Sequence, residues 1–126
     1  MINIVDSSGW LEYFADGPNA DFFAGPIQDT QQLVVPVASI LEVFTCIARQ
    51  RGEGEALQAI TAMQEGTVAE LTASVALESA RLSLEDHLTR AESILLATTR
   101  THRATLWTQN PNLKNLEGVR YVDKNR

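Results

Sequence analysis

Short apolar runs rich in β-branched residues alternate with longer helical segments along this chain, and this alternation limits the folds open to it. The predicted strands cover residues 2–5, 33–36, 67–71, 104–107 and 119–122. The predicted helices run from Ser7 or Ser8 to Ala15 and over residues 20–28, 38–51, 55–64, 74–85 and 90–103. Strands separated by helices form right-handed crossovers, so the pattern predicts an α/β fold with a parallel sheet and helices on both faces.

The length of the chain predicts one domain over residues 1–126, with a frayed polar tail from Asp123. No apolar run approaches the ~18 residues that a membrane helix needs. The amino terminus reaches Asp6 without the basic segment of a signal peptide. Cys46 is the only cysteine, which excludes an internal disulfide framework. These features predict a cytoplasmic protein with no membrane association.

The charge balance narrows the ways in which this chain could act on a nucleic acid. Ten Lys and Arg residues stand against sixteen Asp and Glu residues, for a net charge of -6. A protein that held nucleic acid mainly by releasing counterions would carry a basic face. If the substrate is a phosphodiester, a bound divalent metal could attract it, and the positions of the acidic residues become the main question.

The predicted topology brings certain polar residues to one edge of the sheet. In open parallel sheets, binding sites form at the carboxyl ends of the strands. Asp6 ends the first strand, and Asn110 and Asn112 follow the fourth. Each also has a purely structural interpretation, since Asp6 could cap the helix that follows it and the asparagines could belong to an ordinary turn.

Two glutamates in helices have their own competing interpretations. The one-turn neighbours of Glu42 are small, which suggests a surface that another group approaches closely, although a plain exposed glutamate is the alternative. Thr89 and Glu92 match a capping box, in which the glutamate returns to the backbone N–H of the threonine. Glu92 also shares the helix face of Leu95, so capping and a functional role are compatible.

Other families of parallel-sheet proteins lack their required motifs here. The chain contains neither the G-x-G-x-x-G fingerprint nor a Walker motif, which excludes those types of nucleotide binding. Asp6-Ser7-Ser8 lacks the adjacent acids of a receiver domain and the Asp-x-Asp of a haloacid-dehalogenase-type phosphatase.

Several segments together resemble the PIN domain family, and more narrowly the VapC class of toxin endoribonucleases. The segments are Asn3-Ile4-Val5-Asp6-Ser7-Ser8-Gly9-Trp10-Leu11, Val35-Pro36, Ser39-Ile40-Leu41-Glu42-Val43, Ala91-Glu92-Ser93-Ile94-Leu95-Leu96-Ala97-Thr98, Leu106-Trp107-Thr108-Gln109 and Leu116-Glu117-Gly118-Val119. The resemblance implies a three-layer α/β/α sandwich with a five-stranded sheet in the order 3-2-1-4-5. It also implies a homodimer, a VapB-like antitoxin partner, and cleavage of RNA, of the tRNA or rRNA class, with Mg²⁺ or Mn²⁺.

The family places an Asp after the first strand, a Glu in the helix after the second, and two acids nearer the carboxyl terminus. Asp6 and Glu42 match this pattern directly, whereas Glu92 stands where an Asp is usual. Asn110 and Asn112 replace the aspartates of the family's Asp-x-Asp-Phe segment. The resemblance therefore implies a metal site of Asp6, Glu42 and Glu92, with Asn110 as a fourth catalytic position.

These departures leave alternatives open. Three carboxylates could hold one ion, with Asn110 and Asn112 orienting a water and Thr108 and Ser7 in supporting positions, but a second ion is disfavoured. In the alternative, the chain is a degenerate PIN module that binds an antitoxin or RNA without cleaving it. In a third, the asparagines were introduced to disarm a toxic protein. The basic residues expected nearest the acids, as RNA contacts, are Arg49, Arg51, Arg90 and Lys114.

Overall fold

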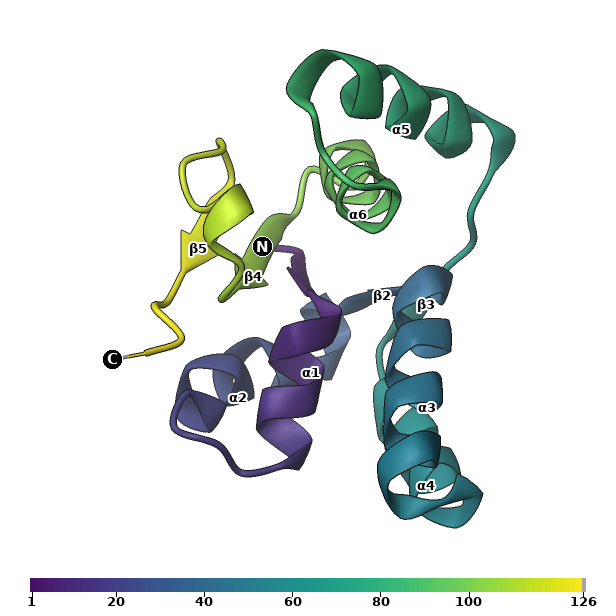
Figure 1. The fold of residues 1–126 in the computed structure, drawn as a ribbon, viewed down its shortest axis with the longest axis vertical. Helices are drawn as coiled ribbons and strands as arrows, with labels where there is room; N and C mark the ends of the chain where they lie inside the picture. Colours follow the sequence, from purple (N-terminus) through teal and green to yellow (C-terminus); the bar gives the residue numbers. More distant parts are fainter. Residues whose placement is uncertain (126) are drawn as a thin grey trace.

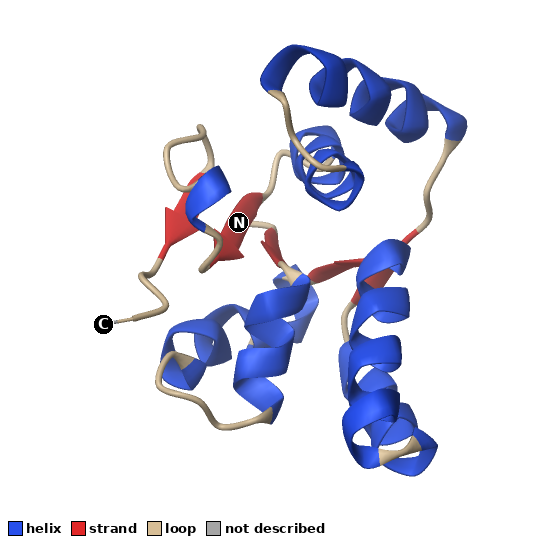
Figure 2. Ribbon diagram, viewed as in Figure 1, coloured by secondary structure: helices blue, strands red, loops and turns tan. Residues whose placement is uncertain are grey.

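Five short parallel strands form the middle layer of the fold in the computed structural model, which describes residues 1–125 (Figures 1 and 2). The described strands are β1 (Asn3–Val5), β2 (Val34–Pro36), β3 (Thr67–Ala69), β4 (Thr105–Thr108) and β5 (Val119–Tyr121). Each lies within two residues of its predicted position, and the fourth is displaced by one residue toward the carboxyl terminus. The predicted parallel direction of the strands is confirmed.

The strands pair as two short sheets whose edge strands, β1 and β2, are neighbours. One has the order β1-β4-β5 and the other pairs β2 with β3. A single parallel bridge, between Asn3 and Leu33, links the two sheets. The strands therefore follow the predicted order 3-2-1-4-5, but β2 and β1 are joined by this bridge alone rather than by a continuous ladder.

Helices cover both faces of the strands, which confirms the predicted three-layer α/β/α sandwich. The described helices are α1 (Ser7–Phe14), α2 (Ala20–Gln28), α3 (Val37–Arg51), α4 (Glu53–Met63), α5 (Ala73–Asp86) and α6 (Arg90–Thr101). Two short 3₁₀ turns, Thr30–Gln32 and Pro111–Leu113, were not predicted. In Figures 1 and 2, α5 and α6 lie on one side of the strands and α1 to α4 on the other.

The central strands are buried on both faces, as the unbroken apolar pattern of β2 predicts. Ile4 and Val5 point to opposite sides of β1, so they join different clusters of the core. Val5 packs with Trp10 and Phe23 on the side of α1 and α2, whereas Ile4 packs with Leu106. This double burial holds the carboxyl ends of β1 and β4 in place beneath the site.

Gly9 allows α1 to lie close to β1 and α2. A Cβ at this position would lie 2.6 Å from Cε1 of Phe23 and 2.7 Å from Cγ1 of Val5, and both partners are fully buried. We expect Gly9→Ala to lower the free energy of unfolding by about 1–3 kcal/mol, because the overpacked core must shift. Urea denaturation would measure this loss. Gly25→Ala is the matched control, since nothing lies within 4 Å of its Cβ, and an equal loss in both variants would contradict the steric explanation.

The segment after β5, predicted to be a polar tail from Asp123, makes some contacts with the rest of the fold. Val122 is buried and its N–H donates to the carbonyl oxygen of Thr108 at 3.0 Å. The Asn19 side chain, which is fully buried, donates to the carbonyl oxygen of Asp123 at 3.1 Å. The Asp123 carboxylate in turn accepts from the N–H of Asn125 at 2.9 Å. Val122 and Asp123 are thus held against the body of the fold, Lys124 and Asn125 are exposed, and Arg126 lies outside the described residues.

None of the helices described in residues 1–125 has the length and apolar character needed to cross a membrane.

Candidate active site at the carboxyl edge of the sheet

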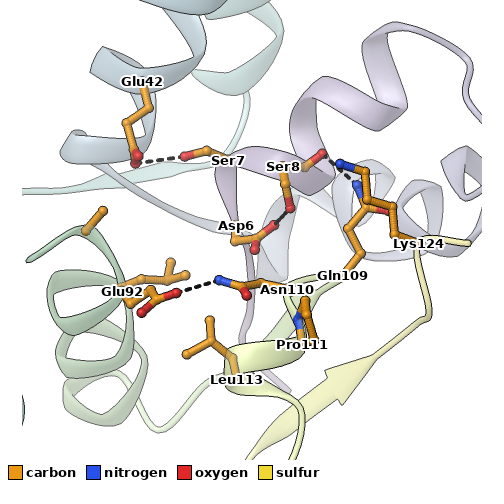
Figure 3. Close-up of a pocket in the computed structure, with 12 residues that line it drawn as sticks. Asp6, Ser7, Ser8, Glu42, Glu92, Gln109, Asn110, Pro111, Leu113 and Lys124 are labelled. Atoms are coloured by element: carbon orange, nitrogen blue, oxygen red, sulfur yellow. Dashed lines mark hydrogen bonds between the residues drawn. The ribbon is translucent and has the colours of Figure 1, made fainter. Parts of the chain in front are cut away.

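A pocket with a volume of about 350 Å³ lies beside the carboxyl ends of β1 and β4. Its polar lining is Asp6, Ser7, Ser8, Glu42, Glu92, Gln109, Asn110 and Lys124. Figure 3 shows that these side chains come from β1 and α1, from α3, from α6, from the loop after β4 and from the segment after β5. Three predicted metal ligands and Asn110 therefore line one pocket, although they are far apart in the sequence.

Asp6 lies at the base of this pocket and is also the N-cap of α1. One carboxylate oxygen accepts from the N–H of Gly9 and from the hydroxyl of Ser8, both at 2.8 Å. The other accepts from the hydroxyl of Thr108 at 2.5 Å. Capping and a place in the pocket, which the sequence left as alternatives for Asp6, are both present in the structure.

Burial dominates the electrostatics of Asp6. The residue is only 5% exposed, and the loss of solvation raises the pKa of its carboxyl above the ordinary value of 3.8. Hydrogen bonds from Thr108, Gly9 and Ser8 oppose this rise without cancelling it. Burial therefore makes the ionised form of the Asp6 carboxyl costly to hold without a nearby cation.

Glu42 reaches the same pocket from α3. Its side chain is exposed, and one carboxylate oxygen accepts from the hydroxyl of Ser7 at 2.9 Å (Figure 3). Ser7 is the first residue of α1, so this contact joins α3 to the helix that Asp6 caps. Ser7 and Thr108, which were predicted to support the site, thus each hold one of the acidic side chains.

Glu92 completes the capping box predicted at the start of α6. The N–H of Thr89 donates to Oε1 of Glu92 at 3.0 Å, and the N–H of Glu92 donates to the hydroxyl of Thr89 at 3.2 Å. Its other oxygen, Oε2, accepts from the side-chain amides of Asn110 at 2.8 Å and Asn112 at 3.2 Å. The two asparagines therefore act as donors to Glu92, and the prediction that they orient a water is not tested by this arrangement.

These donors set the charge state of Glu92. Desolvation is the largest single influence and acts to raise the pKa of Glu92. The hydrogen bonds from Thr89, Asn110 and Asn112 together outweigh it, so the pKa lies below the ordinary value of 4.5. Glu92 is accordingly an anion that neutral amide and backbone donors stabilise.

The donor types in this pocket suit a divalent metal. Carboxylate and amide oxygens are the hard ligands that Mg²⁺ and Mn²⁺ accept, and Asp6, Glu42, Glu92 and Asn110 supply them. As the side chains lie, no group of three His, Cys, Asp or Glu residues among residues 1–125 is close enough to share one ion. The residues fit the ion by chemistry, and Glu42 and Glu92 must turn toward the buried Asp6 before three carboxylates can meet.

The four basic residues predicted as RNA contacts lie outside the lining of this pocket. Arg49 borders a shallow groove on α3 that Glu42 also borders, and Arg51 forms an ion pair with Glu55 at 3.9 Å. Arg90 lines an apolar groove between α5 and α6, and the ammonium of Lys114 lies 5.9 Å from the ring centre of Tyr121. The basic side chain that does line the pocket is Lys124.

Lys124, Ser8 and Gln109 line this pocket but were not predicted from the sequence as parts of the site. The side chain of Gln109, which is 4% exposed, accepts from Asn19 at 3.0 Å and donates to the carbonyl oxygen of Ser8 at 3.4 Å. The position of Gln109 directly after a buried strand could have indicated that it belongs to the site. No comparable sequence feature indicates Lys124, because it follows the last strand in a polar segment typical of chain termini.

Comparison with known families agrees with the predicted resemblance. Residues 4–119 match the PIN domain family. The chain belongs to this family. The match spans the described strands except the first residue of β1 and the last two of β5, and it includes Asp6, Glu42, Glu92 and Asn110. No curated protein matches the sequence of this PIN domain.

Solved structures share the fold of this PIN domain at low sequence identity. A toxin–antitoxin complex from Klebsiella pneumoniae matches with a TM-score of 0.80 and 20% identity, over 94% of this chain and 95% of that one. VapBC2 from Rickettsia felis, bound to a DNA fragment from its promoter, matches with a TM-score of 0.75 and 9% identity, over 98% of both chains. VapC20 from Mycobacterium tuberculosis, a toxin that cleaves the sarcin-ricin loop, matches with a TM-score of 0.67 and 14% identity, over 82% and 85%.

Proposed function

We propose that this PIN domain is the toxin of a VapC-type toxin–antitoxin pair and cleaves RNA phosphodiester bonds with one bound Mg²⁺ or Mn²⁺. The observation that carries the proposal is the buried carboxylate of Asp6 at the carboxyl edge of the sheet, in one pocket with Glu42 and Glu92. Ionising a buried carboxyl whose pKa is raised by desolvation is costly for stability, and such groups are concentrated at functional sites.

The similar structures support the same class of activity and partner. Two of them are toxin–antitoxin complexes, and a third is a toxin that cleaves the sarcin-ricin loop. We propose a VapB-like antitoxin as the partner of this chain and an RNA of the tRNA or rRNA class as its substrate. The homodimer and the cytoplasmic location implied by the family resemblance remain predictions.

The roles of the acidic residues follow from their surroundings. Asp6, Glu42 and Glu92 would hold the ion, with Asp6 kept in one orientation by Thr108, Ser8 and Gly9. A bound divalent ion would neutralise phosphate charge and make a nearby water more acidic. Asn110 cannot accept a proton as an aspartate can.

A second candidate function, binding without cleavage, has an observation of its own. The amides of Asn110 and Asn112 already occupy Oε2 of Glu92, and Thr89 occupies Oε1. An ion must displace these donors before Glu92 can bind it. In this second candidate the pocket persists as a folded surface for an antitoxin or an RNA, and no ion enters.

Metal-dependent stabilisation separates the two candidates. If the site binds an ion, we expect Mn²⁺ at ten times its dissociation constant to raise Tm by roughly 3 °C or more. The same titration should leave Asp6→Asn unchanged, because that variant loses the central carboxylate. RNA cleavage with Mn²⁺, Mg²⁺ or EDTA would be measured in parallel. Equal melting temperatures with and without Mn²⁺, together with no cleavage, would favour the binding function.

A further inference from the structure

Lys124 is held over the candidate active site by the folded segment that follows β5. The carbonyl oxygen of Asp123 accepts from the buried side chain of Asn19, and the carboxylate of Asp123 accepts from the N–H of Asn125. The first contact anchors the residue before Lys124 to the body of the fold, and the second closes a turn around Lys124. The same Asn19 side chain donates to Gln109, which lines the pocket. Through Asn19, the backbone next to Lys124 is therefore linked to Gln109 in the pocket lining.

The ammonium of Lys124 is the positive side-chain group that lines this pocket, where three carboxylates also lie. Within residues 1–125, Lys124 forms no ion pair, because the recorded salt bridges join Arg51 to Glu55 and Arg81 to Glu78. Lys124 also lines a larger groove that runs along α1 toward α3 and α4, and Ser8 and Gln109 line both cavities. The ammonium thus stands where the pocket and this groove meet.

The arrangement of charges in the pocket favours an anionic ligand beside Lys124. Figure 3 shows Glu92 and Asn110 on one side of Asp6, and Lys124 with Gln109 and Ser8 on the other. A nucleic acid that approaches a chain of net charge -6 needs local positive charge to enter an acidic pocket. A lysine ammonium is a compact charge that binds phosphate oxygens well.

We propose that Lys124 binds a phosphate group of the RNA backbone next to the bond that is cut. This inference rests on the proposed function, because it assigns the place at which that substrate enters. The strand follows from the acidic pocket past Ser8 and Gln109 into the groove, and the ammonium of Lys124 neutralises the phosphate at the junction. Lys124 is a substrate-binding residue that contributes to affinity.

Binding can be tested without cleavage. In the Asp6→Asn background, K124Q should weaken binding of a single-stranded RNA oligonucleotide by about fivefold, which is about 1 kcal/mol. The slope of log affinity against log salt should fall by about 0.7, because one phosphate contact is lost. K124R should restore both values. R100Q is the matched control, since it removes one exposed positive charge near the far end of α6, about 12 Å along the helix from Glu92.

Cleavage gives an independent measure in the chain with Asp6 intact. K124Q should raise KM about fivefold and leave kcat within twofold, because a uniform loss of binding acts on ground state and transition state alike. Lys124 is exposed, so the melting temperature should change by less than 1 °C. If K124Q and R100Q have the same RNA affinity, the same salt dependence and the same KM, the proposal is overturned.

The outcomes also separate this inference from the proposed function. If the chain with Lys124 intact neither binds nor cuts RNA, the proposed function fails and the inference falls with it. If that chain binds and cuts RNA and K124Q behaves in the same way, only the inference fails. If K124Q weakens binding of the antitoxin but not of RNA, Lys124 contacts the protein partner, which overturns the assignment to phosphate.

Discussion

Replacing Asn110 and Asn112 together by aspartate should increase metal-dependent RNA cleavage by about 10- to 100-fold. The substitution removes both amide donors from Oε2 of Glu92, which would then be free to turn toward an ion. It also adds two anionic oxygens beside the pocket, and Mg²⁺ and Mn²⁺ bind such oxygens more strongly than amide dipoles. The rate of cleavage of a defined RNA, measured in Mn²⁺ and in EDTA, would test this expectation.

The same double variant should be less stable without metal. Three carboxylates would then lie close together with no donor between them, and like charges at such distances destabilise the folded state. We expect its melting temperature in EDTA to fall below that of the parent chain, and Mn²⁺ to reverse the loss. Asn115→Asp adds a charge at an exposed position nearby and serves as the control. A variant that gains neither cleavage nor Mn²⁺-dependent stability would show that the asparagines do not limit the site.

Asp6→Asn should abolish cleavage and at the same time stabilise the fold. Loss of the central ligand should reduce the cleavage rate by at least about 100-fold. The amide oxygen can still accept from Gly9 and Ser8, and Thr108 can rotate to accept from the new amide N–H. Because the cost of a buried anion disappears, we expect Tm at pH 7.5 in EDTA to rise by roughly 3 °C.

The pH dependence of this stabilisation follows from the direction of the Asp6 pKa. The folded-state pKa is raised above 3.8, so the folded chain binds the proton more tightly than the unfolded chain. The stability contributed by the protonated form is present in full below pH 3.8 and is lost as the pH rises through the folded-state pKa. The advantage of Asp6→Asn should therefore be largest near neutral pH and shrink on acidification. Asp29→Asn, at an exposed position, should show no such trend.

Local sequence patterns predicted most of the elements of this fold. The apolar run at β2 has no alternation and is buried on both faces, and Gly52 ends α3 with a positive φ of 94°. Thr89 and Glu92 form the capping box that their spacing predicts. These features depend on contacts within a few residues, so they can be recognised without knowledge of the rest of the chain.

Local sequence patterns did not predict the interrupted pairing between β1 and β2. Strand pairing between β1 and β2 depends on how far the helices packed on either side let the strands approach. The outcome is one bridge, between Asn3 and Leu33, instead of a continuous ladder. The sequence predicts apolar strands for both β1 and β2. The length over which these two strands pair cannot be read from the residues of either strand.

The strand ends of the sequence predicted Asp6 at the edge of the sheet, and the resemblance to the PIN family added Glu42 and Glu92 to the same site. What each of these side chains contacts depends on the tertiary structure. Ser7 holds Glu42, Thr108 holds Asp6, and the asparagines donate to Glu92, through contacts that span from 18 to 102 residues. It also brought Lys124 to the pocket, since a buried asparagine from the loop before α2 anchors the segment that carries it. Such contacts depend on distances between elements that are remote in the chain, and no local pattern encodes them.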